Sequence, residues 1–301
     1  MQKKLMRKLA DGPGFLPILM NLRRVANGYQ PIFLDYKVEA LPRYGYGRPP
    51  HPEIARILAA REEDYRSLLA QFLDFSHDML RLPLRQPSSS PEPGWINEWL
   101  DGLDTFALYG FLATRNPALL LEIGSGNSTK LARRAIRDHQ LQTKIISIDP
   151  HPRAEVDPLC DEIVRQPLEE CDLNVINRLG ARDVLFMDGS HRSFMNSDVT
   201  VFFLEILPRL RPGVLVHIHD IFLPIDYKPW WLQRFYPHRY WSEQYLLAAS
   251  LLAGHSSYDI ILPNHYVSMT PHLAKVLDTF WSEPQLADVP QSGCSFWIQA
   301  K

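Results

Sequence analysis

Aspartate and histidine side chains recur in the second half of the chain, each group directly after a short apolar run. Asp188 and His191 lie in the segment DGSH, and His217, His219 and Asp220 lie in the segment HIHD. An imidazole titrates near neutral pH and can accept the proton of a reacting hydroxyl group. Carboxylate oxygens and imidazole nitrogens can also bind a divalent metal ion. The two segments therefore predict a site for general-base catalysis or for a metal ion.

Three interpretations of these residues stay open. In the first, His191, His219 and Asp188 are the catalytic residues, with His191 the first candidate for the base and His219 the second. In the second, Asp188 and Asp220 bind a divalent metal ion, Mg²⁺ or another, and His219 or His191 completes the set of ligands. In the third, the histidines only hydrogen-bond to neighbouring loops, which we favour for His217 because it lies within a predicted strand.

An acid and two glycines stand in the segment LEIGSGNST. Gly124 and Gly126 allow the backbone to turn tightly and to approach a ligand without a side chain between them. The dinucleotide-binding pattern G-x-G-x-x-G lacks its third glycine, because Thr129 occupies that position. Glu122, just before the turn, suits a cationic ligand better than a pyrophosphate. Asp149 ends the next apolar run and can hold two ribose hydroxyl groups.

Apolar runs alternate with amphipathic segments from residue 118 onward. Strands are predicted at 118–123, 144–149, 161–164, 183–188 and 214–220, with two more at 258–262 and 294–300. Apolar strands separated by helices predict a parallel sheet covered on both faces, and the last two strands can form a hairpin at its edge. The fold class is therefore α/β, with a doubly wound, mostly parallel, seven-stranded sheet. In such sheets ligands bind at the carboxyl ends of the strands, where all of these candidate residues lie.

The first part of the chain has a different pattern. Residues 1–95 contain no convincing series of strands and predict an N-terminal helical extension, with an amphipathic helix within 51–83. The helix-breaking segment RQPSSSPEPG then marks a boundary, and a helix is expected over 95–117. Residues 96–301 form the predicted catalytic domain.

An aromatic segment of about residues 221–256 follows the fifth predicted strand. Its prolines prevent one continuous helix, although a helix with Ser242 as its cap is expected over 242–253. Aromatic rings stack on sugars and flat rings, so this segment predicts a lid over the site. Tyr227, Trp230 and Trp231 are the candidates for contacts with a substrate, and most of the other rings are expected to pack against the sheet.

The motifs LEIGSGNST, ISIDP, DVLFMDGSH and VLVHIHDIFLP resemble, in this order, those of class I S-adenosylmethionine-dependent methyltransferases. They are most similar to the methyltransferase-24-like branch, and the resemblance covers residues 118–300. It implies a Rossmann-like methyltransferase fold, S-adenosylmethionine as the cofactor, and O-methylation of a small hydroxylated metabolite or sugar.

The resemblance also implies roles for single residues. Glu122 would lie by the methionine amino group, and Asp149 would bind the ribose hydroxyls. Gln166 and Leu168 would contact the adenine. Some related enzymes that use Mg²⁺ have an acid directly before the final Asp, where this chain has His219. This difference counts against Mg²⁺ and admits a softer ion. The cofactor-binding residues expected on this basis are Glu122, Gly124, Ser125, Gly126, Asn127, Ser128, Asp149, Pro150, Gln166, Leu168 and Asp188.

Composition excludes several classes of protein. The 301 residues carry a formal net charge of −2, which gives no general attraction to nucleic acid. The three cysteines form no C-x-x-C pair and indicate free thiols in a reducing, cytoplasmic compartment. No apolar run is long enough to span a membrane. The basic N-terminal segment predicts a helix that packs on its own domain or on a second subunit of a homo-oligomer, and contact with a membrane surface remains an alternative.

Two other functions remain open at this point. A catalytically inactive protein that binds the cofactor or acts as a scaffold would keep the same fold. A metal-dependent hydroxylase or hydrolase would use the two aspartates and two histidines with stoichiometric metal and no S-adenosylmethionine. The intact glycine turn disfavours the second of these.

Overall fold

The computed structural model describes residues 22–29, 32, 35–36, 41–152, 154–233, 239–254 and 257–301. The chain divides into two compact units, which we describe separately. The larger unit comprises Arg43–Asp226 and Trp241–Lys301, and the smaller comprises Met1–Pro42 and Tyr227–Tyr240. Residues 1–21, for which the sequence predicts a basic amphipathic helix, lie outside the described residues. None of the helices in the described ranges combines the length and the apolar character that crossing a bilayer requires.

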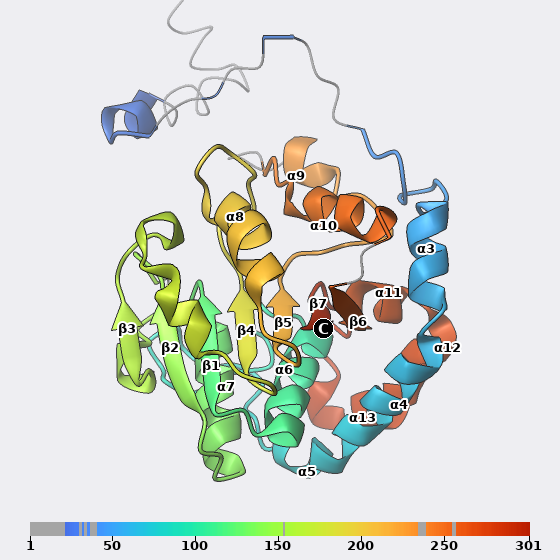
Figure 1. The fold of residues 1–301 in the computed structure, drawn as a ribbon. Helices are drawn as coiled ribbons and strands as arrows, with labels where there is room; N and C mark the ends of the chain where they lie inside the picture. The colour runs from blue at the N-terminus through green and yellow to red at the C-terminus, as the bar shows by residue number, and fades with distance from the viewer. Residues whose placement is uncertain are drawn as a thin grey trace, which may run out of the picture. The chain divides into compact units, whose positions relative to one another are not determined.

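The larger unit is built on a seven-stranded sheet with the order β3-β2-β1-β4-β5-β7-β6 (Figure 1). Strands β1 to β5 are parallel, and β7 is antiparallel to both of its neighbours. The prediction of a doubly wound, mostly parallel sheet is confirmed. The strands are β1 Leu119–Ile123, β2 Lys144–Ile148, β3 Glu162–Val164, β4 Val184–Met187, β5 Leu215–Ile218, β6 Tyr258–Pro263 and β7 Phe296–Ala300.

The register of the parallel strands aligns their carboxyl ends. Ile123 of β1 pairs with Ile148 of β2 and with Met187 of β4, and Met187 pairs in turn with Ile218 of β5. The residues that follow these four positions therefore share one edge of the sheet. Chain order reverses between β1 and β4, which is the point where doubly wound sheets bind ligands.

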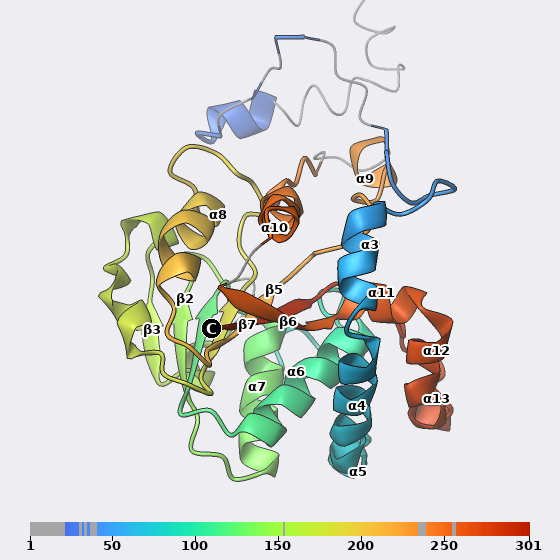
Figure 2. The same cartoon turned by 45° about the vertical axis from the view of Figure 1, so that its right-hand side comes forward.

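Helices cover both faces of the sheet because the central strands are apolar on both sides. Figure 2 shows α6 and α7 on one face and α8 and α10 on the other. On α7, the apolar face that the sequence predicted is buried (Leu131, Ala132, Ala135 and Ile136). The helices are α3 Pro52–Ala59, α4 Glu62–Phe72, α5 Ser76–Met79, α6 Gly102–Arg115, α7 Asn127–Asp138, α8 Asp198–Val201, α9 Trp230–Gln233, α10 Glu243–Leu252, α11 Asn264–Met269, α12 Pro271–Ala274 and α13 Asp278–Trp281.

The helix expected over 95–117 is shorter than predicted, because α6 begins only at Gly102. The backbone N–H of Gly102 donates to the carbonyl of Pro290, and that of Leu103 donates to Ser292. These long-range bonds satisfy the first N–H groups of the helix, which need partners from outside it. Residues 95–101 are thereby free to form a loop, and this loop lies beside the candidate site.

The amphipathic segment within 51–83 is divided into α3, α4 and α5. Phe72 of α4 packs on α6 at Gly110, where an added Cβ would lie 2.4 Å from the Phe72 ring. Its ring centroid is 4.9 Å from that of Phe111. Residues 43–95 thus belong to the same compact unit as the sheet. The domain boundary near residue 95 stays a prediction from sequence.

Candidate functional site

The turn after β1 lies directly against the end of β4. Gly124 has a left-handed φ of +83°, and a Cβ added to it would lie 1.9 Å from the carbonyl oxygen of Asp188. Only glycine accommodates both the conformation and this close approach. A Cβ added to Gly126 meets no atom within 4 Å. The first glycine is therefore required by the fold, and the second borders open space.

Asp149 is held rigidly at the end of β2. Its carboxylate accepts hydrogen bonds from the backbone N–H of Ser125 at 2.9 Å and of His151 at 2.8 Å. It borders a cleft of about 630 Å³, whose wall includes Gly124, Pro150, buried Leu168 and residues 194–198. A carboxylate beside apolar walls can hold the hydroxyl groups and the flat base of a nucleoside.

Five expected cofactor residues do not border this cleft: Gly126, Asn127 and Ser128 border the second cleft described below, and Glu122 and Gln166 border neither. Gln166 is exposed to solvent. The carboxyl group of Glu122 is fully buried, and its Oε2 accepts a hydrogen bond from Thr129 Oγ1 at 2.6 Å. The Thr129 hydroxyl also accepts from the N–H of Gly126, so Thr129 ties Glu122 to the glycine turn. Burial raises the pKa of Glu122 to about 7.

A second cleft, of about 330 Å³, lies on the other side of the glycine turn. The loop of residues 94–100 forms much of its wall, together with Asn127, Ser128 and Lys130. Ser125 and Asp188 border both clefts. Asp188, at the end of β4, therefore lies where the two clefts meet.

His191 lies between three carboxyl groups. Its Nε2 is 3.2 Å from Asp188 Oδ1 and 3.7 Å from Asp220 Oδ2, while its Nδ1 is 2.5 Å from Glu243 Oε1. His191 and Asp220 both have left-handed backbone conformations, with φ of 62° and 55°. Such conformations cost about 1–3 kcal/mol each and cluster at functional sites. The surrounding structure therefore holds both side chains in place.

Glu243 is not among the residues predicted from the sequence. It stands in the first turn of α10 and only 1% of its residue surface is exposed. With Ser242 as the expected cap, Glu243 is the first residue of a predicted helix. Acids are common at that position because they interact favourably with the helix dipole, so the sequence did not mark Glu243 as a site residue. Its partner His191 lies 52 residues earlier, and only the folded chain brings the two together.

Electrostatics favour a charged His191 next to ionised Asp188. Burial lowers the pKa of His191, but Glu243, Asp188 and Asp220 outweigh this and raise the pKa well above its ordinary value. Burial would raise the pKa of Asp188, but His219 and His191 hold it well below its usual range. For Glu243, burial raises the pKa to about 6.

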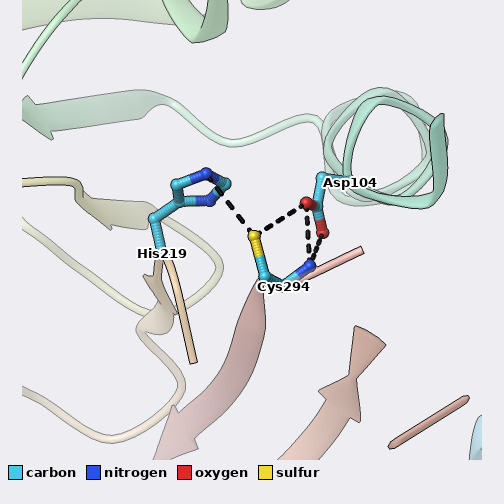
Figure 3. A group of neighbouring side chains, drawn as sticks. All are labelled: Asp104, His219 and Cys294. Carbon is cyan, nitrogen blue, oxygen red and sulfur yellow. Dashed lines mark hydrogen bonds between the residues drawn. The ribbon is translucent and has the colours of Figure 1, made fainter. Parts of the chain in front are cut away.

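His219 belongs to a different group of side chains, with Asp104 and Cys294 (Figure 3). Its Nε2 is 3.1 Å from the carbonyl oxygen of Trp99 and 3.8 Å from Cys294 Sγ. Asp188, His191 and Asp220 each offer one possible ligand atom, and these three atoms lie within 4.8 Å of one another. His219 is not part of this group. Of the two histidines expected as possible metal ligands, His191 therefore lies with Asp188 and Asp220, whereas His219 lies with Asp104 and Cys294. Metal binding itself stays a prediction.

Hydrogen bonds explain why Asp104 and Cys294 lie together in Figure 3. Asp104 of α6 accepts from the backbone N–H of Cys294 at 2.9 and 3.0 Å and from that of Ser295 at 2.9 Å. The Cys294 thiol lies 3.5 Å from Asp104 Oδ2, and burial raises its pKa well above the ordinary value. The thiol therefore stays protonated. The group anchors the chain before β7 to α6.

His217 is a packing residue, in line with our preferred interpretation of it. Its Nε2 is 2.7 Å from Ser295 Oγ, and its ring stacks on Phe186 with centroids 3.8 Å apart. Burial, with the neighbouring His219, lowers its pKa well below the ordinary value, so the ring is neutral.

Tyr227, Trp230 and Trp231 lie in the smaller compact unit. Within that unit, the ring centroids of Tyr227 and Trp231 are 6.3 Å apart, and Lys228 Nζ and the Arg239 guanidinium lie 5.2 Å and 4.9 Å from the Trp231 ring centroid. Residues 234–238 and 255–256 of the expected lid lie outside the described residues. Contact of these aromatic residues with a substrate stays a prediction.

Comparison with known proteins bears on the segment that contains the glycine turn, Asp149, Asp188, His191 and Asp220. Residues 121–221 match a family model described as a methyltransferase domain. Among solved structures, the chain is similar to the SAH-bound methyltransferase PaMTH1 of Podospora anserina, with 15% identity, coverage of 86% of this chain and 100% of that one, and a TM-score of 0.40. The comparison with curated proteins found no match. The matched segment runs from β1 past the end of β5 and contains the glycine turn, so the edge of the sheet that carries Asp149, Asp188 and Asp220 lies in a region similar to methyltransferase domains.

Proposed function

We propose that this protein is an S-adenosylmethionine-dependent methyltransferase, and that it methylates a hydroxyl oxygen of a small hydroxylated molecule, such as a sugar. The observation that carries the proposal is the position of Asp188 where the two clefts meet, with His191 Nε2 directed at it. A methyl donor in one cleft and an acceptor in the other would meet beside a titratable ring. Methyl transfer to oxygen needs alignment of the reactants and removal of one proton.

The cleft beside Asp149 fits S-adenosylmethionine. Asp149 offers carboxylate oxygens to the ribose hydroxyls, and Leu168 and Pro150 offer apolar surface to the adenine. The open space over Gly126 leaves room for the chain between the nucleoside and the second cleft. When bound, the cofactor supplies a methyl group already activated by a sulfonium charge.

His191 is our candidate for the proton acceptor. A positive charge brought close to an imidazolium lowers its pKa, so a sulfonium donor favours the neutral ring. The proton on Nδ1 then remains on the side of Glu243, and Nε2 is left with a lone pair that faces Asp188 and Asp220. The acceptor hydroxyl would lose its proton to Nε2 as its oxygen gains the methyl group.

A divalent cation at Asp188, His191 and Asp220 is the second candidate. Their ligand atoms lie within 4.8 Å of one another, and two carboxylates with one imidazole form a donor set that suits Mg²⁺ or Mn²⁺. Metal-bound histidines commonly donate their other N–H to a carboxylate, as Nδ1 can to Glu243. A cation there would lower the pKa of the acceptor hydroxyl.

The test starts from metal-stripped protein. Calorimetric titration with S-adenosylhomocysteine, without metal and then with Mg²⁺, Mn²⁺ or Zn²⁺, should show binding. Transfer of an isotope-labelled methyl group to a panel of monosaccharides and catechols, followed by mass spectrometry, should give an O-methyl product. Label recovered only on nitrogen or carbon would refute the choice of oxygen. Full activity after metal removal would select His191 alone, and activity restored only by a cation would select the second candidate.

A further inference from the structure

We propose that Glu243 is a positioning residue for methyl transfer, which holds the His191 ring through Nδ1 so that Nε2 stays directed at Asp188 and Asp220. This inference rests on the proposed function, because it gives a purpose to the orientation of that ring. Glu243 Oε1 lies 2.5 Å from His191 Nδ1, and only 1% and 6% of the two side chains is exposed. A bond this short between two buried groups is strongly directional.

The chemistry of the two groups determines where the proton lies. An ionised carboxylate can only accept a hydrogen bond, so Nδ1 must be the protonated nitrogen in this pair. The other nitrogen, Nε2, is then the one that exchanges a proton with a reacting group. A buried acid on Nδ1 is the arrangement that orients and stabilises a catalytic histidine in unrelated enzymes.

Neighbouring residues hold Glu243 in place from both sides. The backbone N–H of Ser242 donates to the His191 carbonyl at 2.9 Å, and the N–H of Ser193 donates to Ser242 Oγ at 2.9 Å. On the other side, Gln244 Oε1 accepts from the N–H of Phe222 at 3.0 Å. The first turn of α10 thus joins the loop after β4 to the loop after β5.

An aromatic ring also packs against the imidazole. The centroid of the Trp241 ring lies 4.0 Å from that of His191, with an interplanar angle of 34°. Residues 241–243 therefore contact His191 through a ring, a backbone N–H and a carboxylate. Three different contacts from one short segment to one histidine indicate that its orientation matters to the site.

The matched variants are Glu243→Gln and Glu62→Gln. Glu62 Oε2 pairs with His272 Nε2 at 2.8 Å, and both residues are absent from the walls of the two clefts. The amide of Glu243→Gln can turn its NH₂ group toward Nδ1, which would move the ring proton to Nε2. We expect kcat with the acceptor from the panel to fall about 10²–10⁴-fold, with KM and the affinity for S-adenosylhomocysteine unchanged. Glu62→Gln should leave all three constants as in the wild type.

Nuclear magnetic resonance of protein labelled with ¹⁵N-histidine provides a readout that needs no acceptor. The wild type should show a proton on His191 Nδ1, and Glu243→Gln should lose that signature while Glu62→Gln keeps it. A kcat within about twofold of the wild type in folded Glu243→Gln, or a wild-type Nδ1 without a proton, would overturn the proposal. If Glu243→Gln fails to fold, Glu243→Asp provides a second variant, which keeps the carboxylate but moves it away from His191 because the side chain is shorter. The same loss of kcat and a weaker signal of the proton on His191 Nδ1 are then expected. Absence of any methyl transfer by the wild type would refute the proposed function, while the resonance of His191 would still decide the role of Glu243.

Discussion

The thiol of Cys294 lies 3.3 Å from Asp220 Oδ1, so the chain just before β7 supports an acid at the end of β5. The same thiol lies 3.5 Å from Asp104 Oδ2, which is held by backbone N–H groups. Cys294 therefore links a structural carboxylate to a candidate site residue.

Replacing this thiol should weaken both stability and activity. Cys294→Ala removes one S–H donor that lies between buried Asp104 and half-buried Asp220, while Asp104 keeps its bonds from the backbone N–H groups of Cys294 and Ser295, so the expected loss is that of one hydrogen bond, about 0.5–1.5 kcal/mol. We expect the free energy of unfolding in urea to fall by that amount and kcat to fall with it. Cys294→Ser keeps a hydroxyl donor and should lose less of both. Equal stability of Cys294→Ala and the wild type would show that the thiol contacts are not stabilising.

Asp149 should decide whether the cofactor binds. Asp149→Ala removes the acceptor of the ribose hydroxyls, and each hydrogen bond to a charged group contributes about 1.5–3 kcal/mol. We expect calorimetry to show at least about a tenfold loss of affinity for S-adenosylhomocysteine. His191→Ala should retain that affinity but slow transfer about 10²–10⁴-fold. Unchanged affinity in Asp149→Ala would place the cofactor elsewhere.

The two glycines of the turn should respond differently to alanine. In Gly124→Ala the new Cβ would overlap the carbonyl of Asp188 at 1.9 Å, in a left-handed conformation that disfavours side chains. Gly126→Ala meets no atom within 4 Å. We expect thermal unfolding to show a large loss of stability for Gly124→Ala and a smaller one for Gly126→Ala. Binding of S-adenosylhomocysteine should fall in the folded Gly126→Ala variant, because the methyl group occupies space over the turn. A Gly124→Ala variant as stable as Gly126→Ala would contradict the close approach of β1 and β4.

Glu122 should make stability depend on pH. Burial raises its pKa in the folded chain from 4.5 to about 7, so between these values the folded chain holds a proton that the unfolded chain has released. The free energy of unfolding should therefore fall as pH rises through this window, by up to about 3 kcal/mol in total from this group.

Glu122→Gln removes the titrating group and tests this directly. Urea unfolding of the variant and the wild type from about pH 4 to about pH 8 should give a difference in stability that changes across the window. The variant should gain on the wild type as pH rises. A difference that is constant with pH would mean that Glu122 is ionised in the folded chain.

The alternation of apolar runs and amphipathic segments was sufficient to predict the strands of the sheet. Strands β1, β2, β4 and β5 are short apolar runs between helices, and burial on both faces of a parallel sheet requires that pattern. Because parallel strands end at one edge, Asp149, Asp188 and Asp220 could be assigned to that edge from sequence alone. The glycine turn was recognisable for a similar reason, since a tight turn with a close backbone approach requires glycine at Gly124.

The partners of His191 were decided only by tertiary structure. Glu243 comes from a helix 52 residues later, and sequence spacing carries no information about which loop that helix will contact. His219 was the second candidate for the base after His191, yet its ring lies with Asp104 and Cys294, because side-chain direction depends on how β5 packs against α6 and β7. Local sequence thus determined which residues reach the edge of the sheet, whereas long-range packing determined which of their atoms face one another.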